Sequence, residues 1–346
     1  MIKVFCMKKI TALLIFCLLS LPFYTFAQRG GFTEIKQLQS PQNPAVGFII
    51  HGGAGIGKKG SLTPEKEKEY RAKLEEVVLA GYKALRLGKS SLDAVELALR
   101  MMEDSPLFNA GKGAVFNSDG KNELDSSIMD GKTLGAGAVA GLRRVKNPIT
   151  LARAVMEKST QVMMIGDGAE KFASEQKIEL VDEKYFWTQE RWDELQKSQV
   201  PGSMLQVPSS MTGAVGAVAL DRNGNLAAGT SAGGMSNKKY GRIGAAAIIG
   251  AGTYANNNTC GVSATGRGDF FIRLGVARDI SALMEYQALT VQVAADRVIQ
   301  NKLQKLGGDG GVIVMDKFGN MAISFNTEGM FRAYINSDGK PIVEIY

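Results

Sequence analysis

The 346-residue chain predicts an α/β protein of the layered, α+β type. Short strands of small apolar residues stand near both ends and near the middle of the chain, and helical stretches are grouped between them. Strict alternation of strand and helix is not apparent, so the pattern favours stacked layers over a simple parallel sheet. The chain is long enough to bury a large core, and 45% of its residues are hydrophobic.

The N-terminal half predicts one strand followed by four helices. Residues 45–51 are apolar with a β-branched centre and end in four small residues at 52–55, which is typical of a buried strand entering a glycine loop. Thr63 and Pro64 form a helix start, and Ser90 with Asp93 forms a second one. The four helices are expected at about 63–88, 90–103, 148–157 and 167–175.

The C-terminal half predicts two similar hairpins separated by two helices. Each hairpin has strands of small apolar residues around an Asp-x-x-Gly-Asn turn, at 221–225 and 316–320. The expected strands are 215–220, 226–231, 312–315 and 321–325, and the expected helices are 270–285 and 289–305.

Residues 186–213 differ from the segments on both sides. They are mostly polar, include Pro201 and Pro208, and lose helical periodicity after Leu195. We expect an exposed, mobile linker here, and an ordinary surface loop is the alternative.

The first 27 residues predict a signal peptide. Three lysines precede a short apolar run from 10 to 23, and Thr25-Phe26-Ala27 offers a cleavage site. Pro22 interrupts the run, which disfavours the alternative of a membrane anchor. We therefore expect an exported protein, periplasmic or secreted, with a single domain at 28–346 and no membrane contact after processing. Only Cys260 would remain, so no intrachain disulfide can form.

The net charge is +7, but the sequence has no basic arm and no segment in which aromatic and basic residues alternate. Nucleic-acid binding is therefore not indicated. The chain has one histidine, His51, which rules out multi-histidine metal sites and allows a Ser-His-Asp triad only with His51 as its base. A P-loop at 52–58 is disfavoured because Lys59 stands where Ser or Thr is required.

Several blocks in order resemble the plant-type L-asparaginase / isoaspartyl peptidase family. The central block, Met-Thr-Gly-Ala-Val-Gly-Ala-Val-Ala-Leu-Asp at 211–221, resembles the self-cleavage site. The others are at 50–55, 108–116, 123–131, 135–140, 163–166, 230–235, 241–244, 250–254, 265–266 and 326–330. The resemblance implies a four-layer αββα sandwich of the N-terminal-nucleophile hydrolase type, usually a homodimer. It also implies hydrolysis of asparagine and β-aspartyl peptides without a required cofactor.

In that family the chain is cut before a threonine, whose freed amine then serves as the base for its own hydroxyl. The cut would fall between Gly213 and Ala214, giving subunits 28–213 and 214–346. The resemblance implies an oxyanion hole from Thr265 and the Gly266 N–H. The other implied positions are Ala232 for a second threonine, Arg242 for the substrate α-carboxylate, Ala245 for an aspartate that binds the α-amine, Gly268 lining the pocket, and a structural sodium loop at Phe108, Asn109, Ala110 and Lys112.

The chain differs from the family pattern at positions that the resemblance assigns to catalysis and substrate binding. Ala214 and Ala232 stand where threonines are expected, and Ala245 stands where an aspartate is expected. Loss of a catalytic nucleophile typically costs on the order of 10⁶ in kcat. We therefore expect an uncut, inactive precursor, with rescue by Thr212 as the alternative. Alanine at all three positions favours deliberate alteration over drift, and both remain open. A non-catalytic protein that binds acidic amino acids or β-aspartyl peptides is the rival function.

Overall fold

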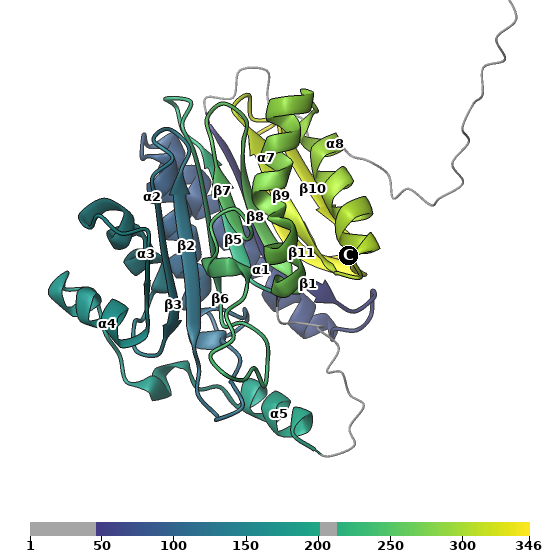
Figure 1. Ribbon diagram of the computed structural model, residues 1–346. Helices are drawn as coiled ribbons and strands as arrows, with labels where there is room; N and C mark the ends of the chain where they lie inside the picture. Colours follow the sequence, from purple (N-terminus) through teal and green to yellow (C-terminus); the bar gives the residue numbers. More distant parts are fainter. Residues whose placement is uncertain (1–45, 201–212) are drawn as a thin grey trace, which may run out of the picture. The chain divides into compact units, whose positions relative to one another are not determined.

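The computed structural model describes residues 46–200 and 213–346. The predicted signal peptide and Thr212 lie outside these residues. The described chain builds two sheets that lie face to face, with helices on both outer faces (Figure 1). Layers of helix, sheet, sheet and helix result, because each sheet buries one face against the other and one against helices.

The larger sheet has eight strands in the order β12-β11-β1-β5-β6-β2-β3-β4. All neighbours are antiparallel except β3 and β4. The strands are β1 (Gly47–Ile56), β2 (Leu124–Asp130), β3 (Ala136–Leu142), β4 (Met163–Ile165), β5 (Val215–Leu220), β6 (Leu226–Ala232), β11 (Gly329–Ile335) and β12 (Pro341–Glu344). Every described residue of β5 and β6 is buried, as expected for central strands covered on both faces.

The smaller sheet has four strands in the order β10-β9-β8-β7, all antiparallel. They are β7 (Thr253–Ala255), β8 (Cys260–Gly266), β9 (Gly310–Asp316) and β10 (Met321–Phe325). Strands β8 and β9 pack against β1, β5 and β6 of the larger sheet. Ile49, Val218, Ile313 and Met315 belong to the apolar cluster that fills this central interface.

The helices divide between the two outer faces. The first group, α1 (Pro64–Arg86), α2 (Ser91–Glu103) and α3 (Pro148–Lys158), packs on the larger sheet. The second group, α6 (Gly268–Leu274), α7 (Val276–Gln287), α8 (Val291–Asp296) and a π-helix at Arg297–Leu303, covers the smaller sheet. Two peripheral helices, α4 (Gly166–Glu175) and α5 (Gln189–Ser198), complete the set. Short 3₁₀ turns occur at Gly111–Gly113, Glu183–Phe186 and Ala245–Ala247.

Most predicted elements are confirmed. Thr63 caps α1 by accepting from the Lys66 N–H, and Ser90 and Asp93 form the reciprocal capping box of α2. Both hairpins form, as β5–β6 and β9–β10. The predicted helix at 270–285 is broken at Gly275, which adopts a left-handed conformation.

Two predictions are wrong. The glycine loop at 52–55 is part of β1, which continues to Ile56 because two bulges absorb its irregularity opposite β11. The predicted linker is not irregular over 189–198, because α5 forms there and buries Leu195. Residues 201–212 of that linker lie outside the described residues. Tertiary packing supplies the order that the local pattern lacks: Trp192 meets the Phe116 ring edge-on at 5.4 Å.

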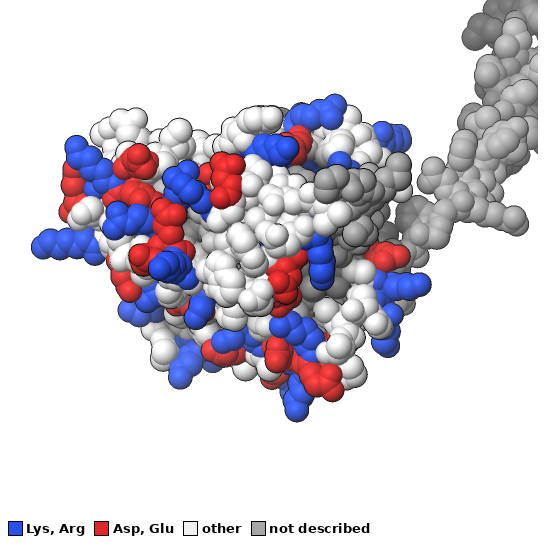
Figure 2. Space-filling model, turned by 90° about the horizontal axis from the view of Figure 1, so that it is seen from below, with Lys and Arg blue, Asp and Glu red and all other residues white. Residues whose placement is uncertain are grey.

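None of the helices in the described ranges is both long and apolar enough to cross a membrane. On the face drawn in Figure 2, acidic and basic side chains are interspersed around an uncharged central area.

Candidate active site

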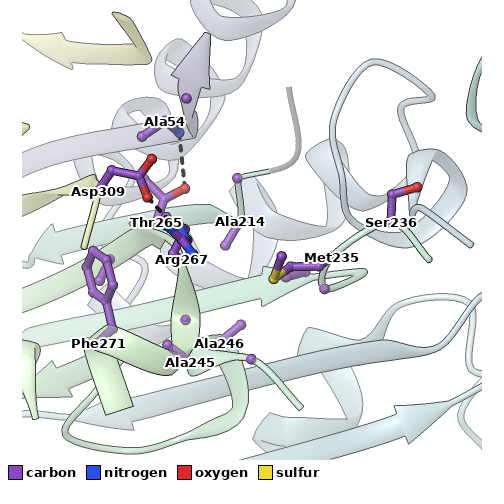
Figure 3. Close-up of a pocket in the computed structure, with 18 of the residues that line it drawn as sticks. Ala54, Ala214, Met235, Ser236, Ala245, Ala246, Thr265, Arg267, Phe271 and Asp309 are labelled. Atoms are coloured by element: carbon purple, nitrogen blue, oxygen red, sulfur yellow. Dashed lines mark hydrogen bonds and ion pairs between the residues drawn. The ribbon is translucent and has the colours of Figure 1, made fainter. Parts of the chain in front are cut away.

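A pocket opens beside the N-terminal end of β5, between the edges of the two sheets. Segments far apart in sequence line it: Ala54 from β1, Gly213 and Ala214 before β5, Ala232 from β6, the loop carrying Met235 and Arg242, and Thr265 from β8. Figure 3 shows Ala214 facing this space, with Thr265 and Ala54 on one side and Ala245 and Ala246 on another. The pocket therefore gathers residues from most of the resembling blocks.

Strand register sets the two alanines on β5 and β6 next to each other. Val215 pairs with Ser231 in the antiparallel ladder, so residue 214 lies opposite Ala232 on the adjacent strand. Ala214 is half-buried and Ala232 is 7% exposed, so both methyl groups form part of the pocket wall. The two positions at which the resemblance expects threonine are thus brought together.

Thr265 has a hydroxyl that is available to donate into the pocket. Its Oγ1 accepts from the Ala54 N–H at 3.1 Å, and among the described residues no acceptor takes its own hydrogen. The backbone of Gly213 passes so close that a Cβ there would collide with this hydroxyl and with Ala54. Gly266 follows with φ +143°, where its missing side chain leaves room for the Asp309 backbone carbonyl.

Arg242 lies at the pocket with a carboxylate partner. Its Nη2 donates to Asp269 Oδ2 at 2.6 Å. Burial opposes ionisation of Asp269, but the hydrogen bond and charge of Arg242 outweigh it and hold the pKa of that carboxyl below its usual value. Gly268 packs against the Arg242 guanidinium and the Ala245 backbone, so a side chain at 268 would displace both.

Behind the pocket, a chain of buried hydrogen-bonded side chains crosses the interface between the sheets. His51 Nε2 lies 2.8 Å from Ser263 Oγ, which lies 2.7 Å from Thr230 Oγ1. Thr253 and Ser127 continue the chain to the Ala246 carbonyl, with distances of 2.7, 2.8 and 2.6 Å. Burial lowers the pKa of His51 to about 3, partly offset by the Ala214 backbone. His51 is therefore neutral at physiological pH.

A second buried support lies under the β6 end of the pocket. Ser231, next to Ala232, donates to Glu103 Oε1 at 2.7 Å, and the Ile149 N–H donates to the same oxygen at 3.0 Å. Burial raises the pKa of Glu103 to about 8, although these hydrogen bonds work in the opposite direction. Asn109 ties the neighbouring loop to the pocket by donating from Nδ2 to the Gly234 carbonyl at 2.8 Å.

Comparison with known proteins decides the family. A sequence profile of the family described as asparaginase matches residues 44–345. The chain belongs to the asparaginase family. It is 48% identical to an isoaspartyl peptidase of Salmonella typhimurium over 311 residues, covering 88% of this chain and 99% of that protein. It is 47% identical to an isoaspartyl peptidase of Escherichia coli (86% and 95% covered) and 41% identical to a plant-type L-asparaginase of Pyrococcus abyssi (84% and 96%).

Membership of the asparaginase family confirms the resemblance drawn from the sequence blocks, and the two helix-covered sheets agree with its fold. The pocket brings together Gly213, Ala214, Ala232, Arg242, Ala245, Thr265, Gly266 and Gly268. The predicted sodium-loop residues Phe108, Asn109, Ala110 and Lys112 do not line it. They lie on the loop that Asn109 fastens to Gly234.

Several backbone carbonyl oxygens lie close together around this loop. The carbonyl oxygens of Glu103, Pro106 and Phe108 crowd around Gly111 and Gly113, where any Cβ would collide with them. Phe108 O and Ala110 O also accept backbone N–H groups from within the loop. Each carbonyl oxygen has a second lone pair, so the loop supplies oxygens of the kind that a hard cation takes. The described residues contain no group of His, Cys, Asp or Glu that could hold a metal ion.

Sequence reasoning missed three charged residues of the pocket: Glu194, Arg267 and Asp309. Arg267 stands between Gly266 and Gly268, two residues that had been singled out, and its charge was the available signal. Glu194 comes from α5, inside the segment expected to be a linker. Asp309 precedes β9 and reaches the pocket only because β9 pairs with β8.

Proposed function

We propose that this chain carries the site of an isoaspartyl peptidase / L-asparaginase and, as written, is an uncleaved and inactive form of it. The observation that carries the proposal is the methyl group of Ala214, which stands in the pocket next to Thr265 and opposite Ala232. The relatives that bear the names isoaspartyl peptidase and L-asparaginase match nearly the whole described chain and support the reaction class.

In the active form, a threonine at 214 would follow a cut after Gly213. Its freed α-amine would take the proton of its own hydroxyl, and that hydroxyl would attack the side-chain amide carbon of the substrate. The hydroxyl of Thr265 and the N–H of Gly266 would stabilise the oxyanion of the tetrahedral intermediate. The amine product would leave, and water would release aspartate from the acyl-enzyme. No cofactor takes part.

The remaining site residues have binding and supporting roles in this proposal. Arg242 would bind the substrate α-carboxylate through its planar fork, and Gly268 leaves space for that contact. Residue 245 would bind the α-amine if it were aspartate, and residue 232 would support the nucleophile if it were threonine. Phe108, Asn109, Ala110 and Lys112 would form part of a loop that holds a structural sodium ion, away from the reaction.

Alanine at 214 removes the chemistry at its first step. Self-cleavage begins with an acyl shift from the backbone nitrogen to the side-chain hydroxyl, and a methyl group has no oxygen to accept the acyl group. The chain would therefore stay as one piece, with 28–213 and 214–346 joined. Its export by residues 1–27, its periplasmic or secreted location and its homodimer are parts of the same proposal.

A second candidate function rests on Arg242, an arginine of the pocket. Arg242 lines the pocket with Thr265 and Gly266 still beside it, so the chain could bind a carboxylate ligand without turnover. This binding protein would take an acidic amino acid or a β-aspartyl peptide. Ala245 counts against tight binding of the ligand's α-amine, because its side chain offers no acceptor. Calorimetric titration of the uncut chain with aspartate and β-aspartyl dipeptides tests it, and no measurable heat would refute it.

The test compares the chain as written with a variant carrying Ala214→Thr, Ala232→Thr and Ala245→Asp. Intact mass should give a single species for the first and two fragments split before residue 214 for the second. Ammonia release from asparagine should be absent in the first and present in the second. Fragments from the unaltered chain, including any split near Thr212, would refute the inactive assignment. A folded variant that neither splits nor hydrolyses would refute the proposed function.

A further inference from the structure

Two arginines line the pocket, and they are held in different ways. Arg242 makes a short, direct ion pair with Asp269 at 2.6 Å. Arg267 lies 3.8 Å from the nearest oxygen of Asp309, which is outside hydrogen-bonding distance. Figure 3 shows Arg267 and Asp309 side by side near Thr265, joined by the dashed line of this pair. Arg267 and Asp309 therefore make no side-chain hydrogen bond to each other.

The backbone of Arg267 is anchored, and no acceptor among the described residues lies within hydrogen-bonding distance of its guanidinium. Its backbone N–H donates to the Asp309 carbonyl at 3.0 Å, and its guanidinium lies over the Phe270 ring at 4.9 Å. Asp309 Oδ1 is buried and has no hydrogen-bond partner among the described residues. The Arg267 donors are therefore open to an acceptor on a ligand, whereas Asp309 Oδ1 could be satisfied only by a donor.

Arg267 follows the proposed oxyanion donors Thr265 and Gly266 directly in the chain. Its acidic neighbour is Asp309, whereas Arg242 pairs with Asp269. If Arg242 takes the aspartyl α-carboxylate, Arg267 is the arginine of the pocket that is left for the group attached to the scissile amide nitrogen. In asparagine that group is hydrogen only. In a β-aspartyl dipeptide it is an amino acid whose own α-carboxylate lies two bonds from the amide nitrogen.

We propose that Arg267 binds the α-carboxylate of the amino acid released from a β-aspartyl dipeptide, which makes the site selective for such dipeptides over asparagine. This inference rests on the proposed function. The guanidinium fork suits a carboxylate, and its donors are not used by Asp309. Asp309 weakens the contact, because its negative charge lies 3.8 Å from the arginine and repels the incoming carboxylate.

The experiment uses the full chain with Ala214→Thr, Ala232→Thr and Ala245→Asp. The probes are β-aspartyl-alanine and the same dipeptide with its C-terminal carboxylate replaced by a neutral amide, and the readout is the ratio of their kcat/KM values. Arg267→Gln should lower this ratio about tenfold, the low end for a charged hydrogen bond, because the Arg267 side chain is 48% exposed. Asp309→Asn should raise the ratio.

Arg273→Gln is the matched control, because Arg273 is exposed and lies over the same Phe270 ring at 5.6 Å but does not line the pocket. It should leave the ratio unchanged. An unchanged ratio in Arg267→Gln, or an equal fall in Arg273→Gln, would overturn the inference alone. A lower ratio in Asp309→Asn would also overturn it. If the altered chain hydrolyses neither dipeptide nor asparagine, the proposed function fails and the inference fails with it.

Discussion

Two buried ionisable groups behind the pocket should give the protein opposing pH dependences. Burial lowers the pKa of His51 from 6.5 to about 3, so the unfolded chain takes up a proton that the folded chain excludes. Stability from this group is complete above pH 6.5 and is lost as pH falls toward 3. Burial raises the pKa of Glu103 from 4.5 to about 8, so the folded chain holds the extra proton. Stability from this group is complete below pH 4.5 and is lost as pH rises toward 8.

Each group contributes a slope of about 1.4 kcal/mol per pH unit inside its own window. The windows overlap between the unfolded values of 4.5 and 6.5, where the two slopes have opposite signs. Their contributions to the unfolding free energy should cancel there. At pH 5, His51 alone would cost about 2 kcal/mol relative to pH 7.

Single substitutions should separate the two effects. His51→Gln should remove the slope below pH 6.5, so its unfolding free energy relative to the parent chain rises as the solution is made more acidic. Glu103→Gln, which mimics the protonated carboxyl, should gain relative to the parent as pH rises from 4.5 to 8. Urea unfolding of the three proteins between about pH 5 and 8 measures these differences, and the other titrating groups cancel between variant and parent.

The pKa of His51 in the folded protein can be measured directly. Its ring resonance in the folded protein is unambiguous by NMR, because the chain has no other histidine. We expect no titration of this resonance between pH 8 and 5. A midpoint near 6.5 in the folded protein would refute the reasoning, as would a His51→Gln variant whose stability runs parallel to that of the parent across this range.

Two smaller predictions concern packing and reactivity. Gly81→Ala should destabilise the protein by about 1–3 kcal/mol, because the new Cβ in α1 would collide with the Phe48 ring. Gly168→Ala in α4 meets open space and should stabilise the protein by about 0.5–1 kcal/mol. Thermal unfolding compares the two variants, and equal effects would contradict the packing argument. Cys260 is fully buried, and burial raises its thiol pKa to about 12, so a thiol reagent should label it only in urea; labelling of the folded chain would contradict this.

The parts of the fold that sequence predicted are those encoded locally. Thr63 and Ser90 cap helices through side chains that reach only three residues along the chain, and the Asp221 turn closes its hairpin within five residues. Helix α5 was missed because its order comes from elsewhere: the buried Arg191 donates to the Gly113 carbonyl at 3.0 Å. A mostly polar segment gives no periodic signal of such a contact.

The candidate site divides in the same way. Ala214, Thr265 and Arg242 were found because each stands in a block with a recognisable order of residues. Asp309 and Glu194 were not, because nothing near them in sequence indicates a pocket, and only β9 pairing and the packing of α5 bring them there. Long-range strand pairing is a property of the whole chain, so local patterns do not reveal which charges share a cavity.

The three alanines also explain how the fold and the chemistry can be separated. Ala214, Ala232 and Ala245 lie on the pocket wall, and none of their side chains belongs to the buried chain from His51 to Ser127 or to the Glu103 support. A methyl group there needs no hydrogen-bond partner, whereas a hydroxyl or carboxylate in the same partly buried positions must be satisfied by neighbours or substrate. Removing them therefore costs the scaffold little and can even stabilise it, as is common where active sites sacrifice stability for activity. Restoring all three should thus return cleavage at a modest cost in stability, so a restored chain that folds but stays uncut would point to a missing group elsewhere in the pocket.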